Sequence, residues 1–169
     1  MSAGARRVLE DSDIVRITHK VDYGVRAVVA LARLSAGQGK VPLKREALAV
    51  REDIPAKFLD DILRSLRNAG LVRSHRGPEG GWTLARDPAD ITVADIIRAL
   101  EGPLASVRGI RPNELPDHGV QEPFVSLWVS VRAALRSVLE EVTVADLAAG
   151  RLPADVVALV DAPGAWDVP

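Results

Sequence analysis

Three side chains that can carry positive charge lie at the start of one short stretch, residues 73–86, which reads RSHRGPEGGWTLAR. Arg73, His75 and Arg76 come directly before the turn-forming residues at positions 77–81. Glycine permits positive φ and proline presets φ, so this cluster predicts a tight hairpin turn. Guanidinium groups bind phosphates and the edges of bases. The stretch therefore predicts a rigid hairpin whose tip carries positive charge toward an anionic partner.

A second group of polar side chains lies on the segment just before this hairpin. Apolar residues repeat there at the spacing of one helix face, which predicts a helix that begins at Ile54 and ends before Gly70. The apolar stripe contains Phe58, Leu59, Ile62, Leu63 and Leu66. The opposite face carries polar and charged residues, namely Lys57, Asp60, Asp61, Arg64, Arg67 and Asn68.

These two groups are positioned by a series of short elements. An upstream helix is predicted from apolar residues at helical spacing, namely Val21, Val25, Val28 and Ala32. A short helix is expected at residues 43–50. After the hairpin, a further helix is predicted. Thr92 as its N-cap and Asp95 three residues later resemble a capping box, and Gly102 and Pro103 end the helix. This order predicts a mainly α fold with a small β-hairpin wing, a winged helix-turn-helix.

A helix-turn-helix places its second helix in the major groove of DNA, with its N-terminal side chains nearest the bases. The predicted contacts come from Ala56, Lys57, Asp60 and Arg64. Asp60 either accepts from a cytosine amino group or is an ordinary exposed carboxylate. In the wing, Arg76 is the main candidate for the minor groove, where narrow A·T tracts attract arginine, and Arg73 and His75 are secondary candidates. Trp82 is expected to anchor the base of the wing.

Charge is divided unevenly along the chain. Residues 1–86 contain 16 Lys and Arg against 10 Asp and Glu, a net charge of +6, and residues 87–169 contain 6 against 13, a net charge of −7. The overall charge of −1 therefore hides a basic first half. A basic face is the footprint of a polyanion-binding protein, although two solvated surfaces of opposite charge would have the same composition.

A long helix is predicted after Pro123. Its apolar residues are spaced alternately four and three positions apart: Phe124, Trp128, Val131, Leu135, Val138 and Val142. This spacing is typical of a seam along which one helix packs against another. The tetrapeptide TVAD recurs at residues 143–146 and predicts another helix start, and the Pro- and Gly-rich end of the chain is expected to be loosely held.

Composition excludes several classes of protein. The 169 residues include no cysteine, which excludes disulfides, thiol catalysis and thiolate-held zinc or iron–sulfur clusters. The sequence has no Gly-rich phosphate loop, and its three histidines are scattered, so we expect no enzyme. No apolar run approaches the roughly 20 residues of a membrane helix, and residues 1–13 lack the apolar centre of a secretory signal, which predicts a cytoplasmic protein without membrane contact.

The segments FLDDILRSLRNAGLVRSHRGPEGGWTLAR and ITVADIIRALEGPL resemble the bacterial winged-helix repressor family that includes the iron–sulfur-cluster biogenesis regulator, the nitric-oxide-sensing repressor and the cysteine-metabolism repressor. The resemblance extends over about residues 15–147. It implies DNA-contacting positions at Pro55, Lys57, Asp60 and Arg76, although family members often have small hydroxyl residues where this chain has Pro55 and Lys57. It also implies that the long C-terminal helix crosses to a partner subunit, and such a homodimer reads a pseudo-palindromic operator.

The loop that follows the EGPL motif departs from that family. Cluster-binding members carry three cysteines there, whereas residues 106–120 of this chain read SVRGIRPNELPDHGV. A site for a metal with nitrogen and oxygen ligands is the less favoured hypothesis, and its candidates are His19, Asp22, Glu114, Asp117 and His118. The effector is then a small molecule, a partner protein or absent. Arg108 and Arg111 are candidates for an anionic effector, and a solvated linker is the simpler alternative.

The predicted organisation has five regions: a flexible extension at 1–13, a winged helix-turn-helix at 14–103, a sensor-type loop without cysteines at 104–122, a dimerisation helix with a short helix at 123–152, and a tail at 153–169. The predicted function is a homodimeric, sequence-specific DNA-binding transcriptional regulator, a repressor without a cofactor. The alternative is a winged-helix module that binds another protein. Such a wing would more often expose apolar residues than charged ones.

Overall fold

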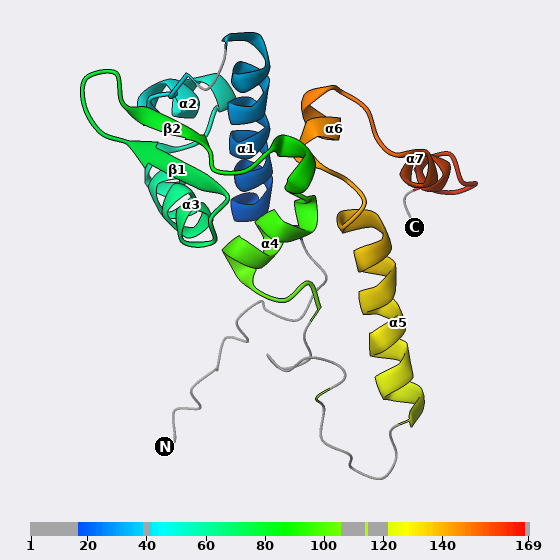
Figure 1. Cartoon of the computed structure of the whole chain (residues 1–169). Helices are drawn as coiled ribbons and strands as arrows, with labels where there is room; N and C mark the ends of the chain where they lie inside the picture. The colour runs from blue at the N-terminus through cyan, green and yellow to red at the C-terminus, as the bar shows by residue number, and fades with distance from the viewer. Residues whose placement is uncertain (1–16, 39–40, 106–113, 115–121, 168–169) are drawn as a thin grey trace, which may run out of the picture.

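The computed structural model describes residues 17–38, 41–105, 114 and 122–167. This part of the chain is mainly α-helical with one two-stranded antiparallel hairpin, as the sequence predicts (Figure 1). The elements in chain order are α1 (His19–Gln38), α2 (Arg45–Glu52), α3 (Ala56–Asn68), β1 (Val72–His75), β2 (Gly81–Leu84), the 3-10 turn η1 (Pro88–Asp90), α4 (Val93–Glu101), α5 (Glu122–Leu139), α6 (Val144–Ala148) and α7 (Ala154–Val160).

Helix α1 forms the centre of the core. It packs against α2, α3, β2, α4 and α6, and its residues 27–32 are all buried. In Figure 1, α3 and the hairpin lie on one side of α1, and α6 lies on the other. A glycine permits close contact with α4, because a Cβ added at Gly24 would lie only 2.4 Å from the Cδ1 atom of Leu100. The core is thus built around one helix that is covered on several sides.

The predicted capping box of α4 is confirmed, and α6 repeats it. Thr92 accepts a hydrogen bond from the amide of Asp95 at 3.1 Å, and the Asp95 carboxylate accepts from the amide of Thr92 at 3.3 Å. The same reciprocal pair joins Thr143 and Asp146. The two helix starts also lie side by side, since Thr92 and Thr143 form an isolated antiparallel bridge. Helix α6 therefore packs into the core that the earlier helices form.

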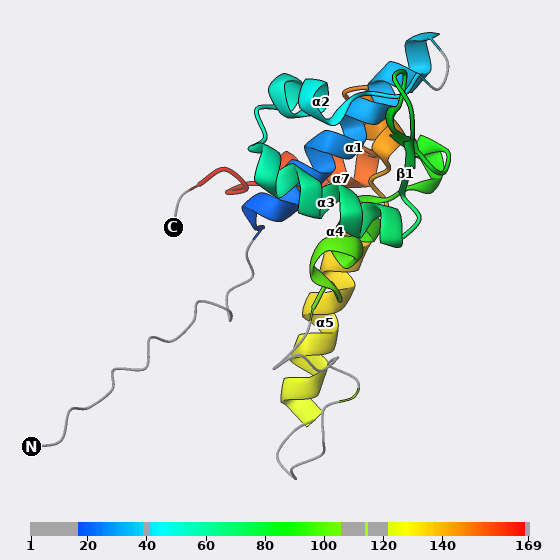
Figure 2. The same ribbon diagram turned by 90° about the vertical axis from the view of Figure 1, so that its left-hand side faces the viewer.

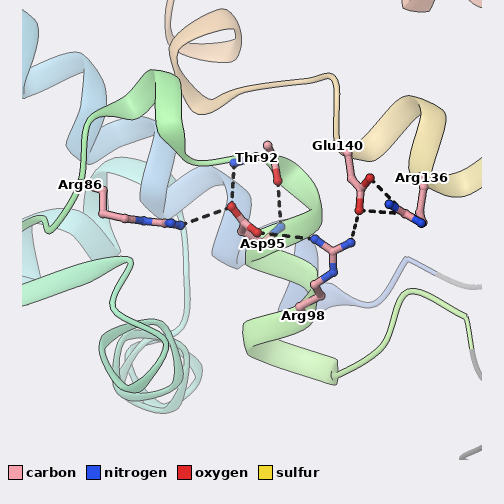
Figure 3. Close-up of polar contacts among 6 residues, drawn as sticks. All are labelled: Arg86, Thr92, Asp95, Arg98, Arg136 and Glu140. Atoms are coloured by element: carbon pink, nitrogen blue, oxygen red, sulfur yellow. Dashed lines mark hydrogen bonds and ion pairs between the residues drawn. The ribbon is translucent and has the colours of Figure 1, made fainter. Parts of the chain in front are cut away.

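Helix α5 extends away from this body in both views (Figures 1 and 2). Its C-terminal end is linked to α4 by ion pairs (Figure 3). Glu140, the residue after the helix, accepts hydrogen bonds from Arg136 at 3.0 Å and from Arg98 of α4. Arg98 also pairs with Asp95 at 3.5 Å, and Asp95 pairs with Arg86 at 3.3 Å. A chain of charges thus joins the end of the wing, α4 and the end of α5.

Three expectations about boundaries are wrong. Helix α2 begins two residues later than expected and ends at Glu52. Val142 does not belong to the seam of the long helix, because α5 ends at Leu139 and Val142 is 5% exposed within the core of its own chain. The tail expected to be loosely held contains a helix, α7, and its Val156 is buried.

Among the helices of the described residues, none combines the length and the apolar character of a membrane span.

Candidate nucleic-acid interface

Helix α3 buries one face in the core and presents its N-terminal end to solvent. The buried face consists of four residues of the predicted apolar stripe: Leu59, Ile62, Leu63 and Leu66. The helix begins at Ala56, two residues later than predicted, and Ile54 is buried. Pro55 is the N-cap residue, and its carbonyl accepts from the amides of Phe58 and Leu59 at 3.0 and 3.1 Å. The side chains of Pro55, Ala56 and Lys57 are consequently exposed where the helix starts.

Phe58 differs from the rest of the predicted stripe. It is 52% exposed, and its ring lies against Tyr23 of α1 with a centroid distance of 6.1 Å. Since each residue turns an α-helix by about 100°, Phe58 lies about 90° from the middle of the buried stripe. It therefore occupies the edge of the apolar stripe and, unlike the other four residues of that stripe, it is not buried.

Asp60 is engaged by a neighbouring helix. Arg45, the first residue of α2, places its Nη1 atom 2.9 Å from Oδ1 and 2.7 Å from Oδ2 of Asp60. The other edge of the same guanidinium donates to Glu46 from Nε at 3.0 Å and from Nη2 at 2.7 Å. The hydrogen bond with Asp60, and then that with Glu46, raises the pKa of Arg45, and the bond from Arg45 lowers the pKa of Glu46. The sequence reasoning missed Arg45, because nothing local signals a pair between residues on two different helices.

The remaining charges of α3 are exposed. Arg64 pairs with Asp61 one turn earlier at 3.4 Å, and both side chains are about two-thirds exposed (66% and 67%). Surface pairs of this kind contribute little to stability, so Arg64 can exchange this partner for a phosphate at small cost. Among the described residues, Lys57 and Arg67 have no hydrogen-bonding or ion-pair partner for their side chains. Three cations of α3 are thus available to an external anion.

The hairpin forms where the sequence predicts it. Val72 pairs with Leu84 and His75 with Gly81, in an antiparallel register with the turn between Arg76 and Gly80. Gly77 has a φ of +101°, and a Cβ added at Gly80 would lie 2.3 Å from the carbonyl oxygen of His75. Both positions therefore require glycine, and the turn is fixed by backbone geometry.

The three cationic candidates of the wing differ in what their side chains contact. Arg73 donates from Nη2 to the carbonyl of Ala85 at 2.7 Å, and the ring of His75 lies 2.9 Å from the hydroxyl of Thr83. Arg76 is exposed at the turn, and no described residue binds its guanidinium. The first two side chains therefore brace the wing, whereas Arg76 is free to bind an external partner.

The base of the wing is attached to the linker before α2. Leu43 and Trp82 form an antiparallel bridge, with amide-to-carbonyl distances of 3.0 and 2.8 Å in the two directions. Trp82 is half-buried and packs against the core cluster, in agreement with its predicted role as an anchor. The bridge extends the hairpin by a third strand-like segment and holds the wing beside α2 and α3.

Helix α3 and the hairpin share one face of the molecule. Figure 1 places both on the side away from α6 and α7, and Figure 2 turns that side toward the viewer. Among the described residues of α3 and the hairpin, the charged side chains without a protein partner are Lys57, Arg67, Arg76 and Glu79. The face therefore combines an exposed helix start with a rigid hairpin, and three of its four unpaired charges are positive, the fourth being the Glu79 carboxylate in the turn.

Helix α5 exposes an apolar surface. Phe124 is 58% exposed and Trp128 38%, while Val131, Leu135 and Val138 of the predicted seam are partly buried. Leu127 and Val129 are also more than 40% exposed, at 48% and 41%, and the seam reasoning did not include them. Exposed apolar side chains along one extended helix mark a surface for interaction.

Several predicted sensor residues lie outside the described part of the chain, namely Arg108, Arg111, Asp117 and His118. Within the described part, His19 stacks on Tyr23 and Asp22 pairs with Arg26 at 3.3 Å. The described residues contain no group of three or more His, Cys, Asp or Glu side chains that is suited to a metal ion. His19 and Asp22 therefore have contacts of their own within α1.

Comparison with known proteins places this geometry in a family. The sequence model of the Rrf2 family, described as an iron-dependent transcriptional regulator, matches residues 17–150. A Mycobacterium tuberculosis protein named as an HTH-type transcriptional regulator is 47% identical over 147 residues, which cover 87% of this chain and 89% of that protein. The HTH-type transcriptional regulator CymR of Bacillus subtilis is 36% identical over 134 residues, which cover 79% and 90%.

Solved structures agree with this comparison. The structure of CymR from B. subtilis, named as the global cysteine regulator, matches with a TM-score of 0.67 and 34% identity, covering 81% of this chain and 98% of that one. The structure of IscR from T. potens matches with a TM-score of 0.62 and 35% identity, covering 80% and 87%. The chain belongs to the Rrf2 family of DNA-binding, winged-helix transcriptional regulators, and it is not an enzyme.

Proposed function

We propose that the protein is a homodimeric, sequence-specific repressor. Helix α3 enters the major groove with Pro55, Ala56 and Lys57 at its leading end, and the wing brings Arg76 to the adjacent minor groove. The observation that carries this proposal is the shared face of α3 and the wing, on which Lys57, Arg67 and Arg76 have no partner among the described residues. Bound to a promoter, such a protein blocks access of the polymerase.

The proposed dimer uses α5. The helix extends away from the body, and it exposes Phe124, Leu127 and Trp128 to solvent. Tryptophan is among the residue types that contribute most to the binding energy of protein–protein interfaces, so Trp128 is the strongest candidate of the three. A two-fold dimer presents two copies of α3 and of the wing, so it fits a pseudo-palindromic operator.

The Rrf2 family is described as iron-dependent, but the side chains of this chain do not fit an iron–sulfur cluster. Such clusters are held by cysteine thiolates, and the 169 residues include none. The described residues also contain no group of three oxygen or nitrogen ligands. We therefore propose regulation without a cluster, either by an anionic effector that Arg108 and Arg111 of the loop bind or by a partner protein.

The test is fluorescence anisotropy of the purified protein on the DNA upstream of its own gene, beside a scrambled duplex, at several salt concentrations. We expect tight binding that prefers the native duplex and weakens steeply with salt, because phosphate contacts release counterions. In vitro transcription from the bound promoter, with and without the protein, tests repression. Absence of binding to either duplex at low salt would favour a winged-helix module that binds another protein.

A further inference from the structure

The pair between Arg45 and Asp60 is a specific contact between the two helices of the helix-turn-helix. The Nη1 atom of Arg45 lies within hydrogen-bonding distance of both carboxylate oxygens of Asp60, at 2.9 and 2.7 Å. Both side chains remain accessible, with 36% of Arg45 and 45% of Asp60 exposed. The pair therefore lies at the molecular surface, on the side of α3 that the proposed function turns toward DNA, and the core does not enclose it.

An isolated carboxylate is unfavourable at that surface. It carries no donor, so it repels phosphates and the acceptor edges of guanine, and it is tolerated only opposite an amino group of a base. Arg45 compensates the charge of Asp60. The contact uses one nitrogen of Arg45, which leaves each carboxylate oxygen with a second lone pair that can accept from a base.

The guanidinium is itself held in place. Its Nε and Nη2 atoms donate to Glu46 on the same helix, at 3.0 and 2.7 Å. Arg45 is thus bonded at both edges, once to its neighbour on α2 and once to α3. The contacts from α2 therefore favour one orientation of the Asp60 carboxylate before DNA binds, which reduces the rotamer freedom that is lost on binding.

We propose that Arg45 is a positioning residue that determines base specificity through Asp60. It orients the carboxylate and compensates its charge, so that Asp60 accepts a hydrogen bond from a cytosine or adenine amino group in the major groove. This inference rests on the proposed function, because it requires that Asp60 faces DNA. Arg45 itself makes no base contact in this scheme.

The experiment measures base preference together with affinity. A library of operator duplexes, with each position substituted by all four base pairs, is bound by the wild-type protein, Arg45→Met, Asp60→Asn and the double variant. In Arg45→Met we expect the affinity for all duplexes to fall, because the uncompensated carboxylate of Asp60 repels the phosphates. We also expect the base preference at one position of each half-site to weaken about tenfold. Asp60→Asn in the Arg45→Met background restores overall affinity and leaves that preference lost.

Two further variants separate this role from a merely structural one. Arg45→Lys keeps the charge with less orientation, so we expect it to restore overall affinity and only part of the preference. Arg51→Met is the matched control, since Arg51 lies on the same helix and pairs only within it, with Glu52 at 3.5 Å. It should leave the preference at every position unchanged.

The outcomes are distinct. A base-preference profile that is the same in Arg45→Met and the wild type would overturn the inference, even if thermal stability falls, since a simple helix-to-helix brace would have that result. A profile that Asp60→Asn does not change at any position would overturn it as well. A wild-type protein that prefers no duplex would instead contradict the proposed function.

Discussion

Arg98 of α4 and Glu140, the residue that follows α5, form an ion pair that ties the long helix to the winged-helix body (Figure 3). Glu140 also accepts from Arg136, one turn back on α5, with both of its oxygens 3.0 Å from Nε. This carboxylate therefore helps to fix the direction in which α5 leaves the body, together with the backbone hydrogen bond from the amide of Val93 to the carbonyl of Val142 at 3.0 Å. In the proposed dimer, that direction decides the distance between the two copies of α3.

The first prediction concerns the pH dependence of this link. The hydrogen bond from Arg136, and then that from Arg98, lowers the pKa of Glu140. A carboxyl whose pKa is lower in the folded state stabilises that state above its ordinary pKa, and the effect is lost as the pH falls through the folded-state value. We expect Glu140→Gln to have a lower Tm than the wild type at neutral pH, with a difference that narrows below about pH 4.

The neighbouring residue is the control for this measurement. Glu141 is exposed and takes no part in the ion pairs of Figure 3, so Glu141→Gln should follow the wild-type Tm at every pH. A difference between Glu140→Gln and the wild type that stays constant from neutral to acidic pH would show that the carboxylate charge contributes nothing.

The second prediction concerns Gly24, where α1 and α4 approach closely. A Cβ at this position would lie 2.4 Å from Cδ1 of Leu100 and 3.5 Å from Cγ2 of Ile96, both of which are buried. We expect Gly24→Val to lower the free energy of unfolding by about 2–3 kcal/mol, because overpacking a core forces side chains off their rotamers. Urea denaturation measures it, and equal or greater stability of the variant would show that the helices can separate freely.

The third prediction distinguishes the arginines of the wing. Arg76→Ala should weaken operator binding by about 1–3 kcal/mol if the side chain contacts bases, without a change in Tm. Arg73→Ala should lower the stability of the hairpin, because it removes the hydrogen bond to the carbonyl of Ala85. Anisotropy titrations and thermal melts of both variants measure these effects.

Glu79 lies in the same turn and supplies the opposite charge for comparison. Glu79→Gln removes one negative charge from the tip, so we expect it to bind DNA as tightly as the wild type or somewhat more tightly. Unchanged affinity of Arg76→Ala in parallel titrations would refute the assignment of that arginine to the minor groove.

The fourth prediction concerns the proposed dimer. Trp128→Ser should weaken self-association by about 2 kcal/mol or more, because a buried tryptophan at an interface contributes an amount of this order. Ser126→Glu is the control, since two residues correspond to about 200° and place this side chain on the other side of α5. Sedimentation velocity over a range of concentrations measures both, and equal association of the two variants would exclude this face of α5 as the interface.

Much of the fold is predictable because its signals are local. The reciprocal contacts of Thr92 and Asp95 involve residues three apart, so their types alone mark the start of α4. The hairpin turn needs glycine at 77 and 80 for backbone reasons that the sequence displays directly. The buried residues of α3 follow from helical periodicity, and the position of Arg76 follows from that of the turn.

The failures concern features that depend on distant parts of the chain. The spacing of the seam continues to Val142, but the bridge between Thr92 and Thr143 draws that segment into the core and ends the helix earlier. Phe58 lies at the edge of its stripe, where Tyr23 of another helix decides how much of it is covered. The partner of Asp60 could not be read from the sequence, since Arg45 meets it only after α2 and α3 have packed together.

The antiparallel contact at Thr143 also bears on the order of events during synthesis. The body that carries α3 and the wing is completed by a segment that the ribosome makes after α5, since Val144 is fully buried in it and Arg33 of α1 donates to the carbonyls of Leu147 and Ala148 at 3.3 Å. A nascent chain that has emerged only as far as α4 lacks this closing piece. We expect the body that carries α3 and the wing to complete its folding only after α5, the helix of the proposed dimer interface, has been translated. The surface proposed to bind DNA and the surface proposed to bind a second subunit would then form at the same stage of synthesis.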